Sequence, residues 1–190
     1  MAQGASVSRL RGLLSVPNQL TFLRLTFLPF LIITIGYQRY DWALGVLVAS
    51  AASDSLDGML ARRLHQKTAI GAYLDPIADK LLLSSSFFML ALEHKIRWWL
   101  AIIVLGRDVL MLTTAAVILL AVGYVAFPPS LWGKLTTGFQ ILTVFLVIVL
   151  AVFENPVLRL ARGACVWAVA ALTVFSGLHY SLAVARRLSQ

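Results

Sequence analysis

Four aspartates in one short stretch have the residue type and the spacing that catalysis would need. Asp54 and Asp57 are three residues apart, and Asp75 and Asp79 are four apart. Residues at these separations share one face of an α-helix, so each pair can act together. Four carboxylates held close together would raise one another's pKa unless cations lie between them. The spacing therefore predicts a site for one or two divalent metal ions.

The type of ligand narrows the choice of metal and of reaction. Carboxylate oxygens are hard ligands, and no histidine or cysteine joins them at helical spacing, which favours Mg²⁺ or Mn²⁺. Such ions stabilise the charge of a transferring phosphoryl group. Arg62 could contact a phosphate through its planar set of donors, while Gly58 and Ala61 leave room for a bulky substrate. If the metal does not need Asp79, this carboxylate could take the proton of an attacking hydroxyl.

The elements that hold the aspartates are predicted to be membrane-spanning helices. Hydrophobic residues make up 60% of the 190 residues and charged residues only 13%, against about 25% charged in a soluble domain. We expect one all-α membrane domain over 1–190, with a short interfacial helix at 1–18 that ends at Pro17. The apolar segments predict six spans, at about 20–36, 42–62, 73–92, 98–122, 131–152 and 163–185. A tight turn containing Gly71 would let the second and third spans pack antiparallel, so that the four carboxylates converge.

The distribution of basic residues predicts which side of the membrane holds the acid cluster. With both termini in the cytoplasm, the cytoplasmic loops and ends carry eight of the sixteen basic residues. The opposite side carries five, namely Arg39, Lys95, Arg97, Arg159 and Arg162. This bias places the aspartates at the cytoplasmic end of their helices.

The net charge and the cysteine count exclude several other classes of protein. A net charge of +8 in so apolar a chain indicates anionic lipid headgroups rather than nucleic acid as the partner. The single cysteine, Cys165, excludes a disulfide framework and a cysteine-based zinc site. For the acid cluster itself, the alternatives are a solvated loop, a cation site in a transporter and a binding protein without catalytic activity.

The same stretch resembles the signature of the CDP-alcohol phosphatidyltransferase family, D-x2-D-G-x2-A-R-x8-G-x3-D-x3-D. The resemblance extends to the layout of six spans behind a short interfacial helix, and so to nearly the whole chain. Thr68 stands where the family tends to have a small hydroxyl residue. Every fixed position of the signature is present: Asp54, Asp57, Gly58, Ala61, Arg62, Gly71, Asp75 and Asp79.

The resemblance implies an enzyme that uses Mg²⁺ or Mn²⁺ to transfer a phosphatidyl group from CDP-diacylglycerol to an alcohol, releasing CMP. It implies that Asp54, Asp57 and Asp75 bind the metal, and that Asp79 is both ligand and general base. It also implies a homodimer in a bacterial inner membrane. The segment Pro17–Thr21 resembles the start of the first span in the glycerol-lipid branch, although Asn18 could instead be a helix N-cap. The residues implied to bind CDP-diacylglycerol are Asn18, Thr21, Gly58, Ala61, Arg62, Thr68 and Gly71.

The acceptor alcohol is predicted less directly. The segments 17–25 and 133–140 resemble those of phosphatidylglycerophosphate synthases. Because these are the commonest members of the branch, glycerol 3-phosphate is the expected acceptor by a narrow margin, with Arg107 and Lys134 as the residues that would bind it. Two departures, Asp108 for a glutamate and Thr136 for a second lysine, resemble CMP-forming cardiolipin synthases, whose acceptor is phosphatidylglycerol. Arg107 could instead pair with Asp108, and Lys134 could instead be an interfacial lysine that helps to set topology.

Overall fold

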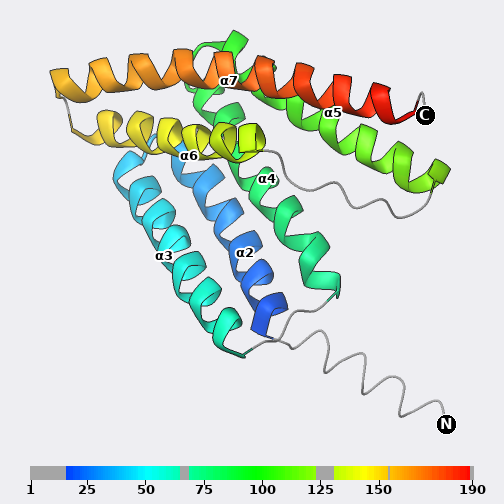
Figure 1. The fold of residues 1–190 in the computed structure, drawn as a ribbon. Helices are drawn as coiled ribbons and strands as arrows, with labels where there is room; N and C mark the ends of the chain where they lie inside the picture. The colour runs from blue at the N-terminus through cyan, green and yellow to red at the C-terminus, as the bar shows by residue number, and fades with distance from the viewer. Residues whose placement is uncertain (1–15, 65–68, 123–130, 154, 189–190) are drawn as a thin grey trace. The chain divides into compact units, whose positions relative to one another are not determined.

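Six helices make up the part of the chain that the computed structural model describes. Its backbone covers residues 16–64, 69–122, 131–153 and 155–188, and its side chains 25–53, 80–114, 117, 131–153 and 155–182. The helices are α2 (Val16–Gly36), α3 (Tyr40–Leu64), α4 (Ala69–Leu92), α5 (Trp98–Val122), α6 (Leu131–Val152) and α7 (Pro156–Leu188) (Figure 1). The predicted all-α class is confirmed for these residues.

Each predicted span lies within one of these helices. The largest difference from the prediction concerns where the first helix begins. Residues 1–15 of the predicted interfacial helix lie outside the described residues, but Val16, Pro17 and Asn18 belong to α2. The predicted interfacial helix therefore does not extend over 16–18, and its presence before Val16 stays a prediction. Proline fits the first turn of a helix because the N–H groups there have no intrahelical acceptor.

Two stretches of the described residues are both long and apolar enough to cross a bilayer. They are Leu131–Val152, which is α6, and Pro156–Leu182 of α7, with mean hydropathies of 2.4 and 1.6. Shorter apolar stretches, Leu25–Gly36 and Lys80–Leu92, lie in α2 and α4. Length and composition thus support membrane crossing by at least the last two helices.

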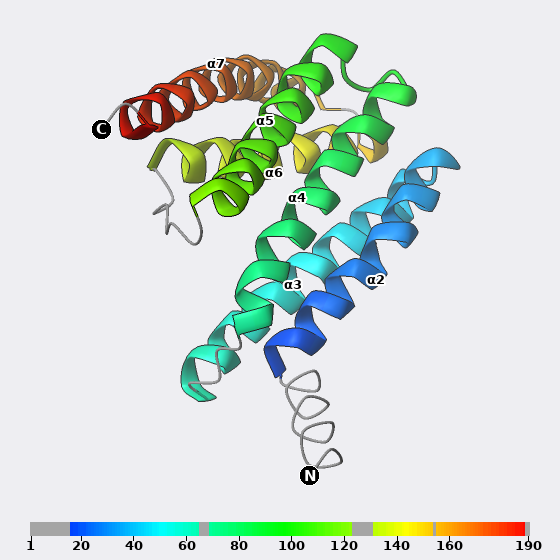
Figure 2. The ribbon, with the colours of Figure 1, turned by 90° about the vertical axis from the view of Figure 1, so that its right-hand side faces the viewer.

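The chain divides into two compact units, with a boundary inside α4 between Ser85 and Ser86. In the first unit, α2 and α3 form a hairpin and lie side by side (Figure 2). The buried apolar residues on these two helices are Leu31, Ile35, Tyr40, Ala43 and Leu47. Within the first unit, most of the described side chains belong to this hairpin.

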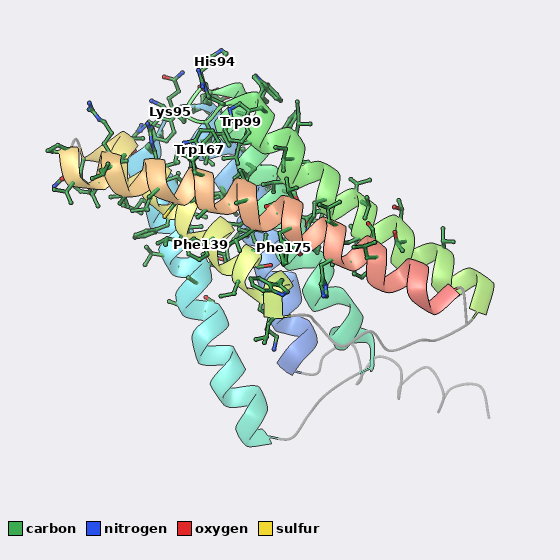
Figure 3. The ribbon with its side chains drawn as sticks, turned by 45° about the horizontal axis from the view of Figure 1, so that its top comes forward. His94, Lys95, Trp99, Phe139, Trp167 and Phe175 are labelled. Atoms are coloured by element: carbon green, nitrogen blue, oxygen red, sulfur yellow. The ribbon has the colours of Figure 1, made fainter. Side chains whose placement is uncertain are left out.

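In the second unit, α7 packs along both α6 and α5. Thr136 Oγ1 donates a hydrogen bond to the Leu172 carbonyl at 3.3 Å, which links α6 to α7. The rings of Trp99 on α5 and Trp167 on α7 have centroids 5.6 Å apart, and Figure 3 labels both residues. Val169 of α7 is fully buried. α7 is therefore the central helix of this unit.

Helices α2 and α4 each end in the same type of turn, in which a residue other than glycine has a left-handed backbone conformation. Gln38 follows α2 with φ 56°, and His94 follows α4 with φ 54°. At the end of α4, Lys95 N donates to Leu90 O at 2.9 Å and His94 N to Ala91 O at 3.1 Å. These are the two hydrogen bonds of a Schellman motif, in which glycine is the usual left-handed residue.

We expect His94→Gly to stabilise the protein by about 0.5–1 kcal/mol. Glycine removes the left-handed strain of about 1–2 kcal/mol but adds entropy to the unfolded chain. Thermal unfolding in detergent measures the change. His94→Ala is the matched control, since it keeps the Cβ and should give no gain; equal stability of the two variants would contradict the prediction.

Candidate active site

The predicted metal ligands fall on two consecutive helices. Asp54 and Asp57 belong to the C-terminal part of α3, and Asp75 and Asp79 to the N-terminal half of α4. Helical backbone at all four positions confirms the premise that each pair shares a helix face. Their side chains, like those of all residues from 54 to 79, lie outside the described side chains. Their convergence therefore stays a prediction.

The connection between α3 and α4 is shorter than predicted. Gly71 is the third residue of α4, so it lies in a helix and not in the turn. A glycine in a helix costs only about 1 kcal/mol relative to alanine, so it need not end the helix. Thr68 falls outside the described residues. Chain geometry limits the Cα separation of Leu64 and Ala69 to about 18 Å, which keeps the two acid-bearing helix ends in one neighbourhood.

The other residues expected to bind CDP-diacylglycerol lie in the first turns of α2 and near the end of α3. Asn18 is the third residue of α2, which differs from the N-cap position considered above, and Thr21 follows in the next turn. Gly58, Ala61 and Arg62 lie in the same part of α3 as the first aspartate pair. All five belong to the first unit, as do the four aspartates.

The donor set of this region fits a hard divalent cation. Four carboxylates at helical spacing supply oxygen ligands alone, which suits Mg²⁺ and Mn²⁺. Among the side chains that the structure does describe, no group of three His, Cys, Asp or Glu could hold a metal ion. The candidate metal site is therefore the four-aspartate stretch and not a place in the described side chains.

Arg107, one of the two expected acceptor-binding residues, is buried between α5 and α7. Its Nη1 donates to Asp108 Oδ1 at 2.8 Å, and its Nη2 to Ser176 Oγ at 3.0 Å. Arg107 is 7% exposed and Asp108 4%. The alternative considered for Arg107, an ion pair with Asp108, is thus present in the structure. Its Nε is buried and has no hydrogen-bond partner among the described residues, so one donor remains for a ligand or a water.

Lys134, the other expected acceptor-binding residue, is exposed in the first turn of α6. Thr136, where a second lysine would stand in the resembling synthases, is fully buried. Its hydroxyl donates to Trp132 O at 2.7 Å and to Leu172 O of α7. Residues two apart lie on opposite faces of a helix, so these two positions do not present side chains to the same place.

Sequence reasoning missed the polar groups that tertiary packing buries in the second unit. Ser176 binds Arg107 from 69 residues away, a partnership that no local pattern indicates. Within the part of the chain that the structure describes, Gln140 Nε2 on α6 and Thr173 Oγ1 on α7 are buried and have no hydrogen-bond partner. Each such group costs about 1–3 kcal/mol, unless a water or ligand reaches it.

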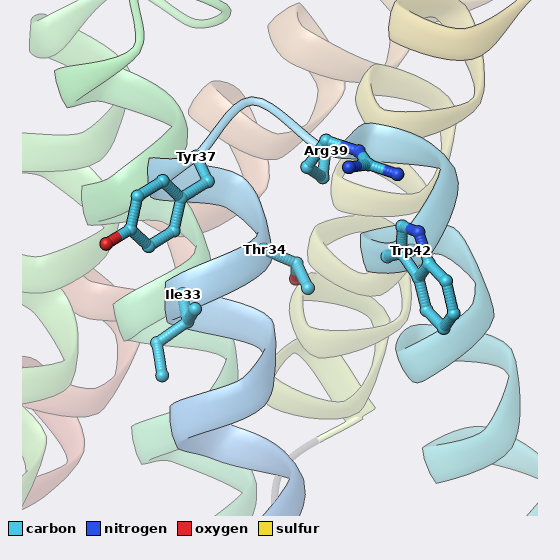
Figure 4. Close-up of a pocket in the computed structure, with 5 residues that line it drawn as sticks. All are labelled: Ile33, Thr34, Tyr37, Arg39 and Trp42. Atoms are coloured by element: carbon cyan, nitrogen blue, oxygen red, sulfur yellow. The ribbon is translucent and has the colours of Figure 1, made fainter.

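A pocket of about 330 Å³ opens beside the turn between α2 and α3 (Figure 4). Its cation is already engaged, because Arg39 Nη2 lies 3.4 Å from Asp41 Oδ2. The hydrogen bond from Arg39 lowers the pKa of the exposed Asp41 carboxyl. Thr34 Oγ1 donates to Phe30 O of its own helix at 2.8 Å. We assign no chemistry to this pocket, which is lined by Ile33, Thr34, Tyr37, Arg39 and Trp42.

These observations define a class of all-α proteins that have apolar helices and carry paired aspartates on two consecutive helices. Comparison with known families is specific: the sequence profile described as CDP-alcohol phosphatidyltransferase matches residues 14–175. The chain belongs to the CDP-alcohol phosphatidyltransferase family, which is membrane-bound.

Relatives within the family carry two different names. The chain is 31% identical over 174 residues to the CDP-diacylglycerol--glycerol-3-phosphate 3-phosphatidyltransferase of Aquifex aeolicus, covering 89% of this chain and 95% of that protein. It is 39% identical over 104 residues to the protein of the same name from Pseudomonas fluorescens, covering 52% of this chain and 53% of the relative. It is 36% identical over 111 residues to the cardiolipin synthase (CMP-forming) of Streptomyces coelicolor, covering 55% and 52%. The chain thus spans about half the length of the last two.

Proposed function

We propose that this protein transfers a phosphatidyl group from CDP-diacylglycerol to an alcohol and releases CMP. The observation that carries the proposal is the spacing of four aspartates, three and four residues apart, on the consecutive helices α3 and α4. Membership of the CDP-alcohol phosphatidyltransferase family supports this reaction. A transporter would share the apolar helices but would have no need for the complete signature around Asp57 and Asp79.

In this reaction the hydroxyl oxygen of the acceptor attacks the phosphorus that bears diacylglycerol. A new P–O bond forms, the P–O bond to CMP breaks, and CMP leaves with the bridging oxygen. Asp79 takes the proton from the attacking hydroxyl. Asp54, Asp57, Asp75 and Asp79 would hold Mg²⁺ or Mn²⁺, which when bound neutralises charge on the reacting phosphates.

The remaining signature residues bind and orient CDP-diacylglycerol in this proposal. Arg62 supplies several donors to a phosphate, and Gly58 and Ala61 leave space for the nucleotide against α3. Asn18 and Thr21 on α2 and Thr68 and Gly71 before and within α4 complete the binding set. The binding of a diphosphate near a metal in this way holds the leaving group in line for displacement.

The proposed setting is a bacterial inner membrane crossed six times, with the aspartates and both termini on the cytoplasmic side. The long apolar stretches of α6 and α7 support membrane crossing by these two helices. The cytoplasmic assignment rests on the excess of basic residues in the loops expected there. A homodimer is proposed from family membership alone.

Glycerol 3-phosphate is the acceptor that we propose first. The relative that aligns with 89% of the chain bears a glycerol-3-phosphate phosphatidyltransferase name, whereas the Streptomyces coelicolor cardiolipin synthase aligns with 55%. Arg107 and Lys134 would bind its phosphate. In that role the unpartnered Nε of Arg107 is the donor left over from Asp108 and Ser176.

Phosphatidylglycerol is the second candidate, and a specific observation favours it. Thr136 replaces a cation with a hydroxyl that is buried against α7. Glycerol 3-phosphate brings a dianionic monoester, while phosphatidylglycerol brings a monoanionic diester that needs less positive charge. An acceptor site with one cation fewer suits the lipid better.

An acceptor panel tests the proposal. Purified full-length protein in detergent, with Mg²⁺ and CDP-diacylglycerol, is given glycerol 3-phosphate, phosphatidylglycerol, serine or inositol phosphate in turn. We expect CMP release and phosphatidylglycerophosphate formation with glycerol 3-phosphate at least about tenfold faster than with the others, a difference of about 1.4 kcal/mol in transition-state binding. Mass spectrometry identifies the lipid formed.

Each outcome of the panel has a meaning. Cardiolipin formed from phosphatidylglycerol would replace the first acceptor with the second and leave the reaction type intact. Absence of CMP with every acceptor, from protein that unfolds cooperatively on heating, would overturn the enzyme assignment in favour of a transporter or a binding protein.

A further inference from the structure

A second pocket, of about 140 Å³, lies at one end of the second unit and is lined by three basic side chains. The connection after α4, the last turns of α6 and the first turns of α7 each contribute to it. Together with an apolar wall, the lining comprises Lys95, Val147, Leu150, Ala151, Arg159 and Arg162. None of these residues belongs to the proposed catalytic site.

Basic residues outnumber acidic ones in the sequence segments at this end of the unit. Segments 93–97 and 153–162 contain four cations, Lys95, Arg97, Arg159 and Arg162, and two acids. The acids are Glu93 and Glu154; Glu93 and Lys95 each have a partner in the structure, and Glu154 lies outside the described residues. If each acid neutralised one cation, two positive charges would remain. The pocket therefore favours an anion.

The start of α7 adds to this positive charge. Asn155 already caps the helix, since its Oδ1 accepts from Val157 N at 2.8 Å. No acidic residue lies in the first turn, while Arg159 and Arg162 occupy the first two turns. Cations at a helix N-terminus oppose the macrodipole, so an anion bound between them would relieve the repulsion.

Aromatic residues suggest the depth of the pocket in the proposed membrane. Trp99 contacts Trp167, which is 70% exposed, and Figure 3 labels both at the same end of the unit as Lys95. Tryptophan is enriched at the level of the lipid headgroups. Arg162 precedes Trp167 by five residues, a rise of about 7.5 Å along α7. The basic side chains would then lie among lipid phosphates.

We propose that this pocket binds a phosphate group, that of an anionic phospholipid in the leaflet opposite the catalytic aspartates. The guanidinium groups of Arg159 and Arg162 supply paired donors for phosphate oxygens, and Lys95 supplies a point charge. The apolar wall of Val147 and Leu150 suits the glycerol and acyl portion of a lipid. Free inorganic phosphate offers the same anionic chemistry without that portion. The leaflet rests on the membrane orientation in the proposed function, whereas the pocket does not.

The test compares lipid retention by the purified full-length protein. Wild type, Arg159→Gln/Arg162→Gln and Arg97→Gln are transferred from detergent containing phosphatidylglycerol or phosphatidylcholine, and bound lipid is counted by native mass spectrometry. Arg97→Gln is the matched control, because Arg97 is exposed at the same end but does not line the pocket. We expect the double variant to lose phosphatidylglycerol affinity by at least about tenfold and the control by less than about twofold.

Two further arms separate the sources of phosphate and the role of folding. Millimolar inorganic phosphate should displace little phosphatidylglycerol if the apolar wall contributes; complete displacement would assign the site to a free anion and overturn the lipid. Arg159→Lys/Arg162→Lys keeps the charge and should retain most of the affinity.

Unchanged phosphatidylglycerol binding in the glutamine double variant would overturn the proposal and leave these cations as caps for the C-terminal carbonyls of α6. If the glutamine double variant does not unfold cooperatively, the same lipid-binding measurement on Lys95→Gln replaces it, and unchanged phosphatidylglycerol binding by that variant would overturn the proposal. All the variants keep the proposed catalytic site, so any lipid bound there is the same in each. The difference in phosphatidylglycerol binding between variants is therefore independent of the proposed reaction.

Discussion

Replacing either Asp57 or Asp79 with asparagine should abolish CMP release from CDP-diacylglycerol. Asparagine keeps the size of the side chain and adds no strain to α3 or α4, so the protein should still insert and fold. For Asp79 we expect a loss of about 100- to 10,000-fold, because a general base and a metal ligand are removed together. For Asp57 the loss follows from the missing negative charge at the cation. CMP release from purified protein measures both effects.

A matched control is available on the same helix. Asp41 lies in the first turn of α3, is exposed, and pairs with Arg39 at 3.4 Å. Asp41→Asn makes the same chemical change outside the signature, and an exposed ion pair of this kind contributes little to stability. Its rate should stay within about twofold of wild type. A wild-type rate in Asp57→Asn or Asp79→Asn would remove those residues from the catalytic site.

Removal of divalent metal should reduce CMP release about as much as the Asp57→Asn or Asp79→Asn substitution does. With EDTA in excess, we expect CMP release to fall to background, because four carboxylates without a cation repel one another and the diphosphate of the substrate. Mg²⁺ or Mn²⁺ added beyond the chelator should restore the rate. The measurement is CMP release against free metal concentration, and full activity in EDTA would rule out the proposed metal dependence.

The metal experiment also separates catalytic loss from unfolding. Because the metal is proposed to bind at α3 and α4 and not in the second unit, metal removal should leave most of the helical signal in circular dichroism unchanged. A loss of both activity and helix content would instead indicate that the cation holds the fold. Recovery of activity with added Mg²⁺ within minutes argues for a catalytic role.

Much of the helical architecture could be predicted from the sequence because its cause is local. Apolar runs of about 20 residues end where charged or turn-forming residues appear, and the boundaries predicted for α5 and α6 coincide with those observed. The spacing of the four aspartates needs only a helical backbone to have meaning, and that backbone is present. Pro17 and Gly71 were misjudged because both residues are tolerated in the first turn of a helix.

The candidate site also has a part that the sequence predicts and a part that depends on tertiary packing. The residue types of the four aspartates alone predict a hard cation and phosphoryl chemistry, since ligand preference is a property of the side chains. The partner of Arg107 could not be predicted, because Ser176 reaches it only through the register of α7 on α5. The burial of Thr136 likewise depends on α7 covering one face of α6.

The sequence by itself therefore determined the family, the helices and the type of chemistry. Tertiary structure alone decided which cations meet: Lys95 is more than 60 residues before Arg159 and Arg162, and the three line one pocket because the α4–α5 connection lies beside the ends of α6 and α7 that meet there. Local preference sets a helix within a few residues, whereas a contact between distant residues depends on how whole helices pack. That packing made Arg107 a buried ion pair with Asp108 and left Lys134 exposed.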